Sequence, residues 1–241
     1  MANALAQAGD REGARDACAQ VARALERQDG PDSPVTLYAL SRLAQAMSEA
    51  GDHEDARNVR ERLAEAWARL GGPDSRDAID ALTDLAIASA VLGDLASAIK
   101  TQERALEAMD RVLGRDDLQT REARAVLLGL QALSLALERG PDSPEALDAQ
   151  ERLADALAET LDHDVARDAM ARVASARERL LGPDSPEALD ALHRLALFMI
   201  EAGDRKAATG ALARVADAWT RIKGPDSPEA LEAKARLAEI L

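Results

Sequence analysis

The sequence has few of the residues on which several classes of protein depend. Aromatic residues make up only 2% of the 241 residues, and Cys18 is the single cysteine. One cysteine excludes an internal disulfide framework and suits a reducing environment. No apolar run approaches the roughly 18 residues of a membrane-spanning helix, and the N-terminus lacks a signal-peptide pattern. We therefore expect a cytoplasmic protein whose core is built from small aliphatic side chains.

Basic residues are also in the minority. The chain has 30 Lys and Arg against 44 Asp and Glu, a formal net charge of −14. This balance argues against nucleic acid, whose binding depends on neutralising phosphates, and against anionic membrane surfaces. Lysine and asparagine are scarce while arginine and alanine abound, which is typical of a GC-rich bacterial gene.

No constellation of residues points to catalysis, a metal or a cofactor. The three histidines and Cys18 do not stand at metal-ligand spacing, and no phosphate-binding glycine loop or nucleophile elbow is present. We interpret His53, His163 and His193 as solvated surface residues and Cys18 as a small buried one. The sequence therefore predicts a protein that is not an enzyme and needs no cofactor. A small molecule bound in a cleft stays an open alternative.

A five-residue phrase, Gly-Pro-Asp-Ser-Pro, recurs along the chain and divides it into units. The glycines that open successive units are separated by 42, 42, 26, 42 and 42 residues. A fixed period in this range is typical of stacked-repeat architectures, in which each unit packs on its neighbours. The phrase is intact at 30–34, 140–144, 182–186 and 224–228, altered at 72–76 and eroded at 114–118.

The unit at 182–223 shows how one repeat is predicted to fold. Gly182 ends the preceding helix, Ser185 is placed to cap the next helix, and Pro186 suits its first position. Leucines and alanines then recur at helical spacing until Gly203-Asp204, a pair that ends the first helix and caps the second. Each unit is therefore predicted to be a helix–turn–helix.

Trp67 and Trp219 occupy matching positions, each five residues before a glycine that opens a unit. Leucine or methionine stands at the same position in other units, so we interpret this position as part of the core.

These units are predicted to form two arrays that meet at a junction helix. Both ends of the chain stop in the middle of a unit, which we interpret as the sign of a fragment from a longer protein. The arrays are 1–113, with a truncated first unit and units at 30–71 and 72–113, and 140–241, with units at 140–181 and 182–223 and a final half-unit at 224–241.

The interval between Gly114 and Gly140 is 16 residues shorter than the others and lacks the inner Gly-Asp turn. Residues 114–139 are therefore predicted to hold a single long helix, which interrupts the regular solenoid. Apolar residues lie on nearly every side of this helix, so we expect it to be buried all round. A tight bend at Gly129, giving two short helices, is the alternative.

Two segments carry a resemblance to a known repeat family. Residues 181–186 read Leu-Gly-Pro-Asp-Ser-Pro, and a leucine- and alanine-rich helix follows at 188–196. The unit in this respect resembles a tetratricopeptide repeat of the 42-residue kinesin-light-chain type. The resemblance implies an all-α solenoid, a superhelix of antiparallel helix pairs with the first helices lining its concave face. It also implies a non-catalytic scaffold that binds a protein or peptide on that face.

The positions that bind peptide backbone in relatives hold different residues here. Relatives often carry an asparagine pair there, whereas this chain has arginine at the second position in four units. Arginine suits bidentate binding of a carboxylate or phosphate, so we hypothesise a ladder of arginines that reads an acidic partner. Asp84 takes this position in the second unit, where it breaks the ladder, and it is a further candidate for partner contact. The arginines are Arg42, Arg152, Arg194 and Arg236.

Ordinary ion pairs on helix surfaces are the alternative interpretation of the ladder. Asp148, Asp190 and Glu232 lie four residues before three of the arginines. This spacing favours pairs that contribute about 0.2–0.5 kcal/mol each. Tyr38, one helical turn before Arg42, is a further candidate for partner contact.

The sequence as a whole predicts a protein-binding scaffold, part of a larger bacterial regulatory protein. The alternative is a self-assembling structural module, natural or designed, that forms homo-oligomers through its terminal or junction helices. The apolar residues of the last helix favour this alternative, because uncovered apolar surface tends to find a partner.

Overall fold

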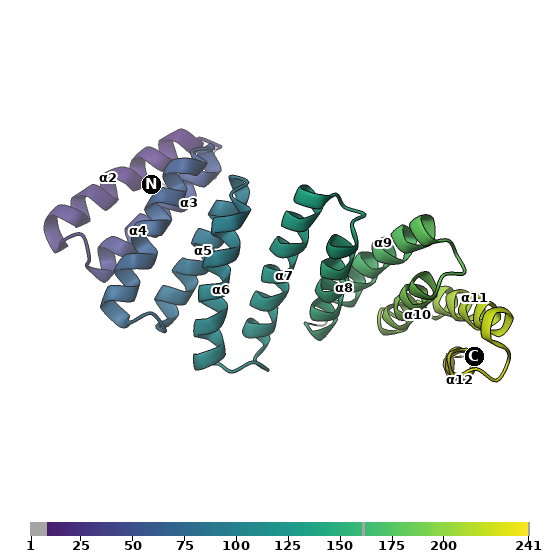
Figure 1. Cartoon of the computed structure of the whole chain (residues 1–241). Helices are drawn as coiled ribbons and strands as arrows, with labels where there is room; N and C mark the ends of the chain where they lie inside the picture. The colour runs from purple at the N-terminus through teal and green to yellow at the C-terminus, as the bar shows by residue number, and fades with distance from the viewer. Residues whose placement is uncertain (1–8, 161, 241) are drawn as a thin grey trace. The chain divides into compact units, whose positions relative to one another are not determined.

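The computed structural model describes residues 9–160 and 162–240, and this part of the chain is built from helices without a strand (Figure 1). Consecutive helices are joined by short turns, and sequence neighbours pack on one another from α2 to α6 and from α8 to α12. The helices are α2 (Arg11–Asp29), α3 (Pro34–Ala50), α4 (His53–Gly71), α5 (Arg76–Val91), α6 (Leu95–Val112), α7 (Leu118–Arg139), α8 (Pro144–Glu159), α9 (His163–Leu181), α10 (Pro186–Glu201), α11 (Arg205–Lys223) and α12 (Pro228–Ile240).

These helices pair as the repeat predicts, which confirms an all-α solenoid of helix pairs. Each complete unit contributes a first helix and a second helix. The first helices are α3, α5, α8 and α10, and the second helices are α4, α6, α9 and α11. The half-units contribute α2, a second helix, and α12, a first helix. We call the exposed side of the first helices the first-helix surface.

The recurring phrase forms the joint between units, as the segment before α10 shows. Gly182 has φ 93° and ψ 155°, a backbone conformation that is essentially restricted to glycine. Ser185 follows as the N-cap of α10, and its hydroxyl accepts a hydrogen bond from the backbone N–H of Ala188. Pro186 occupies the first turn, where its missing N–H costs nothing. The predicted roles of these residues are confirmed.

The turn inside the same unit, between α10 and α11, is formed by the predicted Gly-Asp pair. Gly203 has φ 84°, and Asp204 caps α11 by accepting a hydrogen bond from the backbone N–H of Ala207 at 3.1 Å. A carboxylate at this end of a helix also interacts favourably with the helix dipole. The turn therefore ends one helix and begins the next within a few residues.

The core is a series of small clusters, each formed where three or four successive helices pack together. Met170 and Val173 of α9 are fully buried among residues of α8 and α10. Trp67 and Trp219 are 9% and 6% exposed, which confirms the interpretation that both belong to the core. Most other buried positions hold alanine, so the helices approach closely and no large aromatic core is needed. Burial of each larger aliphatic side chain contributes about 1.5–3 kcal/mol.

Residues 118–139 form one continuous helix, α7, without a turn at Gly129. The expectation that this helix is buried all round is wrong. Val126, Leu133 and Leu137 are exposed, Leu137 by 72%. The buried positions of α7 are held largely by alanine, so these larger side chains are not all needed in the core. The buried residues are Thr120, Ala123, Ala125, Leu127 and Ala132.

The chain divides into two compact units, residues 1–123 and 124–241, and the division falls within α7. In the first unit the side-chain amide of Gln102 in α6 donates a hydrogen bond to the carbonyl of Ala123 at 3.0 Å, which attaches the start of α7. In the second unit Gly129 lies beside Leu153 of α8. That the arrays 1–113 and 140–241 follow separate paths stays a prediction.

None of the helices in the described part combines the length and the apolar character needed to cross a membrane.

Candidate functional site

A groove in the first unit brings together two of the predicted site residues, Tyr38 and Asp84. It lies between the first helices α3 and α5, with α4 behind them, and encloses about 180 Å³. We call it the Tyr38 groove. Pockets for small molecules are usually larger, about 300–1,000 Å³, so this volume suits a single side chain better. The lining residues are Tyr38, Ser41, Arg60, Leu63, Trp67, Asp77, Asp80, Ala81 and Asp84.

Two aromatic rings form one wall of the Tyr38 groove. The ring centroids of Tyr38 and Trp67 are 5.2 Å apart with planes at 57°, a favourable tilted geometry. Tyr38 is nevertheless 57% exposed, so much of its surface faces solvent. Its hydroxyl donates a hydrogen bond to Oδ1 of Asp77 at 3.1 Å, and this bond is the main reason that the pKa of Tyr38 is raised.

Three aspartates of α5 form the opposite wall. Asp77, Asp80 and Asp84 are spaced by three and four residues, so they share one side of the helix. Asp80 has only a long contact with Arg76, 3.8 Å between exposed side chains. Among the described residues, neither a hydrogen bond nor an ion pair is formed by Asp84.

The carboxyl of Asp84 has a raised pKa. Desolvation is the main cause, and the nearby charge of Asp80 adds to it, while the charge of Arg60 acts in the opposite direction. Arg60 is the one cation among the lining residues, and its guanidinium donates a hydrogen bond to Oγ of Ser48 at 2.9 Å. The groove therefore holds more negative charge than its own residues neutralise.

The equivalent position between α8 and α10 in the second unit is occupied by an ion network. Arg177 of α9 contacts Glu151 at 2.6 Å and Asp148 at 3.1 Å. Arg194 of α10 pairs with Glu151 and with Asp155. The side chains of Arg177 and Glu151 are only 14% and 13% exposed, so their charges are largely removed from water. Here the carboxylates of the groove are neutralised by arginines of the chain itself.

Sequence reasoning missed Arg177, although a signal was present. Arg177 stands five residues before Gly182, at the position held by Trp67 and Trp219 in other units. A charged residue at a core position predicts a buried partner. Glu151, whose place is taken by Ser41 in the first unit, is that partner.

At least two of the four arginines in the predicted ladder are engaged by acids of the chain itself. Arg42 and Arg152 are exposed on α3 and α8. Arg194 is engaged by Glu151 and Asp155, and Arg236 of α12 pairs with Glu239 at 3.0 Å. Arg152, Arg194 and Arg236 lie at equivalent positions of successive first helices in the second unit, and Arg42 lies at that position of α3 in the first unit.

The alternative interpretation of the ladder is also wrong in its details. None of the three expected pairs four residues apart forms among the described residues. Asp148 instead contacts Arg177 of the second helix, and the acids that hold Arg194 lie on the preceding first helix. The pairs therefore tie neighbouring helices together and do not stabilise single helices.

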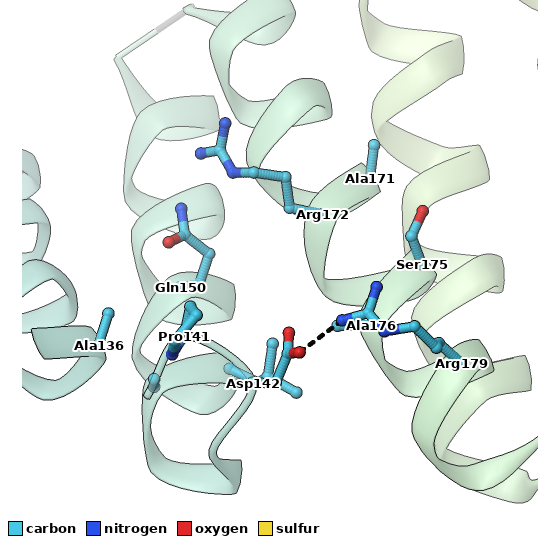
Figure 2. Close-up of a pocket in the computed structure, with 11 residues that line it drawn as sticks. Ala136, Pro141, Asp142, Gln150, Ala171, Arg172, Ser175, Ala176 and Arg179 are labelled. Carbon is cyan, nitrogen blue, oxygen red and sulfur yellow. Dashed lines mark hydrogen bonds and ion pairs between the residues drawn. The ribbon is translucent and has the colours of Figure 1, made fainter. Parts of the chain in front are cut away.

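A second, larger cavity lies between α7, α8 and α9 in the second unit and encloses about 570 Å³ (Figure 2). Asp142 and Arg179 form an ion pair at its rim, 2.6 Å between Oδ2 and Nη2, while Arg172 lies apart from both. Small side chains such as Ala136 and Ala171 leave the space open. None of the predicted site residues lines this cavity.

The residue at position 136 bears on which partner Arg172 can have. In two other units a glutamate stands four residues before the glycine that opens the unit, and it pairs with an arginine of the following second helix. With alanine at this position, Arg172 has no such partner among the described residues. The equivalent pairs are Arg62–Glu26 and Arg214–Glu178.

The described residues contain no group of three His, Cys, Asp or Glu side chains arranged to hold a metal ion. The interpretation of the histidines as solvated is wrong for His163 and His193, which are half-buried. His163 lies 3.6 Å from a carboxylate oxygen of Glu201, because the turn before α9 packs near the end of α10. Cys18 is half-buried against the first core cluster.

Family models of the tetratricopeptide repeat match residues 1–66, 50–109 and 146–187. Together these matches cover more than half of the chain. Comparison with curated proteins found no match.

Several solved structures resemble the chain. One is a crystal structure of kinesin-light-chain TPR-like repeats from Podosopora anserina, 20% identical, covering 92% of each chain with a TM-score of 0.43. BtubC from P. vanneervenii is 15% identical, with 95% of this chain and 80% of that chain covered and a TM-score of 0.40. The TPR2AB domain of yeast Sti1, solved in complex with pHSP90, is 15% identical, covering 99% and 95% with a TM-score of 0.34.

Proposed function

Because the chain belongs to the tetratricopeptide-repeat family, we propose that it is a non-catalytic scaffold that binds a protein or peptide on its first-helix surface. The observation that carries this proposal is the Tyr38 groove. It places an exposed tyrosine and an aspartate without a partner between two successive first helices. Packing of the repeat needs neither residue at these positions, since other units fold with different residues there.

Membership of this family favours a binding function over a catalytic one. Stacked repeats present long exposed surfaces, and tetratricopeptide repeats generally act as protein-binding modules. The TPR2AB domain of yeast Sti1 was solved in complex with pHSP90, and that interaction is a property of Sti1. For this chain we propose a cytoplasmic, bacterial setting within a regulatory protein, on the strength of its single cysteine and its abundance of arginine and alanine.

The arginines of the first helices provide the candidate contacts for acidic residues of the partner. Arg152 is exposed and makes no ion pair with a described residue, and Arg42 is exposed at the equivalent position of α3. Arg194 and Arg236 could join them only by exchanging their present partners, at a cost in intramolecular pairing. We therefore propose that Arg152 contributes most.

Self-assembly is the second candidate. Leu231 of α12 is 51% exposed and Leu137 of α7 is exposed as well. Exposed apolar side chains of this kind favour association. Light scattering over a wide range of protein concentration separates the two candidates. A mass that grows with concentration supports self-assembly, and a constant monomer mass opposes it.

The proposal is tested by selecting peptides from a random displayed library on the full chain and measuring their affinity for surface variants. Charge reversal of Arg42 and Arg152 to Glu should weaken binding by about tenfold or more. The matched control reverses Arg104 to Glu on the second helix α6, and it should leave the affinity unchanged. An equal loss of affinity in the Arg104→Glu control and in the variant that combines Arg42→Glu with Arg152→Glu would contradict the proposal. An unchanged affinity in the combined variant would contradict it as well.

A further inference from the structure

The four complete units share an arginine on the second helix, and one of these arginines differs from the rest in its acidic neighbours. Each stands ten residues before a glycine that opens a unit, and the four are Arg62, Arg104, Arg172 and Arg214. In three units an acid follows three residues later, close enough along the helix to reach the arginine. These acids are Glu65, Glu107 and Asp217. Arg172 is followed at this distance by Ser175.

The preceding helix does not supply the acid that Arg172 lacks. Glu26 and Glu178 on preceding helices contact their arginines at 3.3 Å and 2.8 Å, whereas Ala136 holds this position before Arg172. Arg104 also follows an alanine at this position, but it keeps its acid three residues later. Arg172 is therefore the one arginine of the four with an acid at neither position.

Two further acids near Arg172 are engaged by other arginines. Asp168, four residues earlier on α9, contacts Arg167 at 2.9 Å. Asp142 at the rim of the cavity contacts Arg179 at 2.6 Å, and the same contact recurs at other joints between units. Among the described residues, the guanidinium of Arg172 forms neither an ion pair nor a hydrogen bond. The cavity between α7, α8 and α9 therefore contains a cation without a counter-ion.

The α8 wall of the same cavity carries an independent polar substitution. Gln150 stands where three other first helices carry leucine, namely Leu40, Leu82 and Leu192, of which the first two are each 6% exposed. Gln150 is half-buried, and its amide forms no hydrogen bond with another described residue. Figure 2 shows Gln150 and Arg172 in the cavity, both away from the ion pair at the rim. Because an amide buried without a partner costs free energy, a glutamine at a leucine position indicates a polar occupant.

We propose that this cavity receives a glutamate side chain of the protein partner, whose carboxylate takes the place beside Arg172 that Glu26 and Glu178 take beside the equivalent arginines. The guanidinium donates paired hydrogen bonds to the carboxylate, and the side-chain N–H groups of Gln150 donate a further one. The inference goes beyond the proposed function, because it places a second contact at a cavity formed with the second helix α9, apart from the first-helix surface.

The volume and the border of the cavity favour a side chain of a protein over a free anion. About 570 Å³ accommodates the glutamate together with flanking residues of its chain. Leu137 follows Ala136 directly and Leu133 lies one turn earlier, and they are 72% and 49% exposed. These leucines offer apolar contacts that a protein segment can cover and a small anion cannot.

Two glutamines supply a reporter and an internal control, because Gln150 lines the cavity while the amide of Gln45 on α3 is bound to Glu49. The experiment titrates the full chain, labelled with ¹⁵N, with N-acetyl-glutamate methylamide and follows the side-chain amide signals. The signals of Gln150 should shift and saturate with a dissociation constant of about 10 mM, as for a single ion pair with few added contacts, and those of Gln45 should stay in place. The matching glutamine compound, which has nearly the same shape without the charge, should cause no saturating shift.

Two variants test the proposed place of the carboxylate. Arg172→Gln should abolish the shift of Gln150, and the matched control Arg104→Gln should leave it unchanged, because Arg104 is the equivalent arginine of another unit. Ala136→Glu reproduces the residue found at this position in two other units, so the variant is compatible with the fold. Its own carboxylate should weaken binding of the glutamate compound about tenfold or more.

Four results would each overturn the inference. They are equal responses to the glutamate and glutamine compounds, no response of Gln150 to the glutamate compound at about 50 mM, undiminished binding by Arg172→Gln, and binding of glutarate or inorganic phosphate about ten times tighter than that of the glutamate compound. The last result would assign the cavity to a free anion.

The outcomes separate this inference from the proposed function. If selected peptides lose affinity for the variant that combines Arg42→Glu with Arg152→Glu while Gln150 does not respond to the glutamate compound, the scaffold function stands and the carboxylate site is wrong. If Gln150 responds selectively and the combined variant binds the peptides unchanged, the carboxylate site is real and the proposed function is wrong.

Discussion

Single residues determine the turns between the repeat units, and Gly182 is an example. Its φ of 93° with ψ of 155° is accessible to glycine at little cost and is strained for a residue with a Cβ. An added Cβ would contact nothing within 4 Å, so the strain is purely conformational. The same conformation recurs at other glycines that open units, including Gly72 and Gly224.

We expect Gly182→Ala to lower the free energy of unfolding by about 1–3 kcal/mol. Gly210 is the matched control, because it lies inside α11 with open space around its added Cβ. Gly210→Ala should raise the free energy of unfolding by about 0.5–1 kcal/mol, since alanine favours a helix interior. Urea unfolding measures both changes, and a loss of equal size in both variants would refute the conformational explanation.

The raised pKa of Asp84 makes a prediction about stability and pH. Because burial raises the pKa of the folded carboxyl above its ordinary value of 3.8, the charged form costs stability at neutral pH. This cost disappears as the pH falls below 3.8, where the carboxyl is protonated in both states. Asp84→Asn should therefore stabilise the protein slightly at pH 7 and change nothing well below 3.8.

Asp74→Asn is the control, and its effect on stability at pH 7 should have the opposite sign to that of Asp84→Asn. The hydrogen bond from Arg111, 2.6 Å from Nη2 to Oδ1, lowers the pKa of its carboxyl. The stability it contributes is present above 3.8 and is lost as the pH falls through the lowered pKa. Asp74→Asn should destabilise the protein at pH 7. Thermal unfolding at several pH values checks both variants, and a destabilising Asp84→Asn at pH 7 would contradict the description of the groove.

At the scale of helices, the ion network around Glu151 joins three successive elements. Glu151 of α8 binds Arg177 of α9 and Arg194 of α10, and its side chain is 13% exposed. Glu151→Ala leaves two arginines without this partner, so we expect a loss of about 2 kcal/mol in unfolding free energy. Asp148→Ala, which removes a mostly exposed partner of Arg177, should cost under about 1 kcal/mol. Similar costs for the two variants in urea unfolding would show that burial does not govern the network.

The continuous helix α7 makes a second prediction at this scale. Gly129 lies in its interior, and an added Cβ would make ordinary contact with Leu153 at 3.9 Å. Gly129→Ala should therefore raise the free energy of unfolding by about 1 kcal/mol through helix propensity. Thermal unfolding measures this change. If Gly129 instead formed a bend that required positive φ, the alanine variant would lower the free energy of unfolding.

The elements could be predicted from the sequence because their ends depend on local rules. Ser185 and Asp204 cap the helices that directly follow them, so reading a few residues is sufficient. The network of Glu151 could not be found in this way, since its partner Arg194 lies 43 residues further on. Spacing within one helix suggested Asp190 as the partner of Arg194. Packing between helices instead brought in Asp155 and Glu151.

At the scale of the molecule, repetition accounts for most of the structure and exceptions to it mark the candidate sites. In the Tyr38 groove Asp84 stands where four other first helices carry arginine, and in the larger cavity of the second unit Ala136 stands where two other units carry glutamate. Sequence predicted Tyr38 and Asp84 individually, as departures from the repeat. That they line one groove depends on the packing of α3 and α5 on α4, which no local pattern shows.

The central claim is that partners bind the first-helix surface, and hydrogen–deuterium exchange of the full chain tests it most directly. Exchange is compared with and without a peptide selected on the protein, and the change is measured for each helix. We predict slower exchange in the first helices, above all α3 and α5 beside the Tyr38 groove, with little change in α4 and α6. Slower exchange confined to the second helices would contradict the claim.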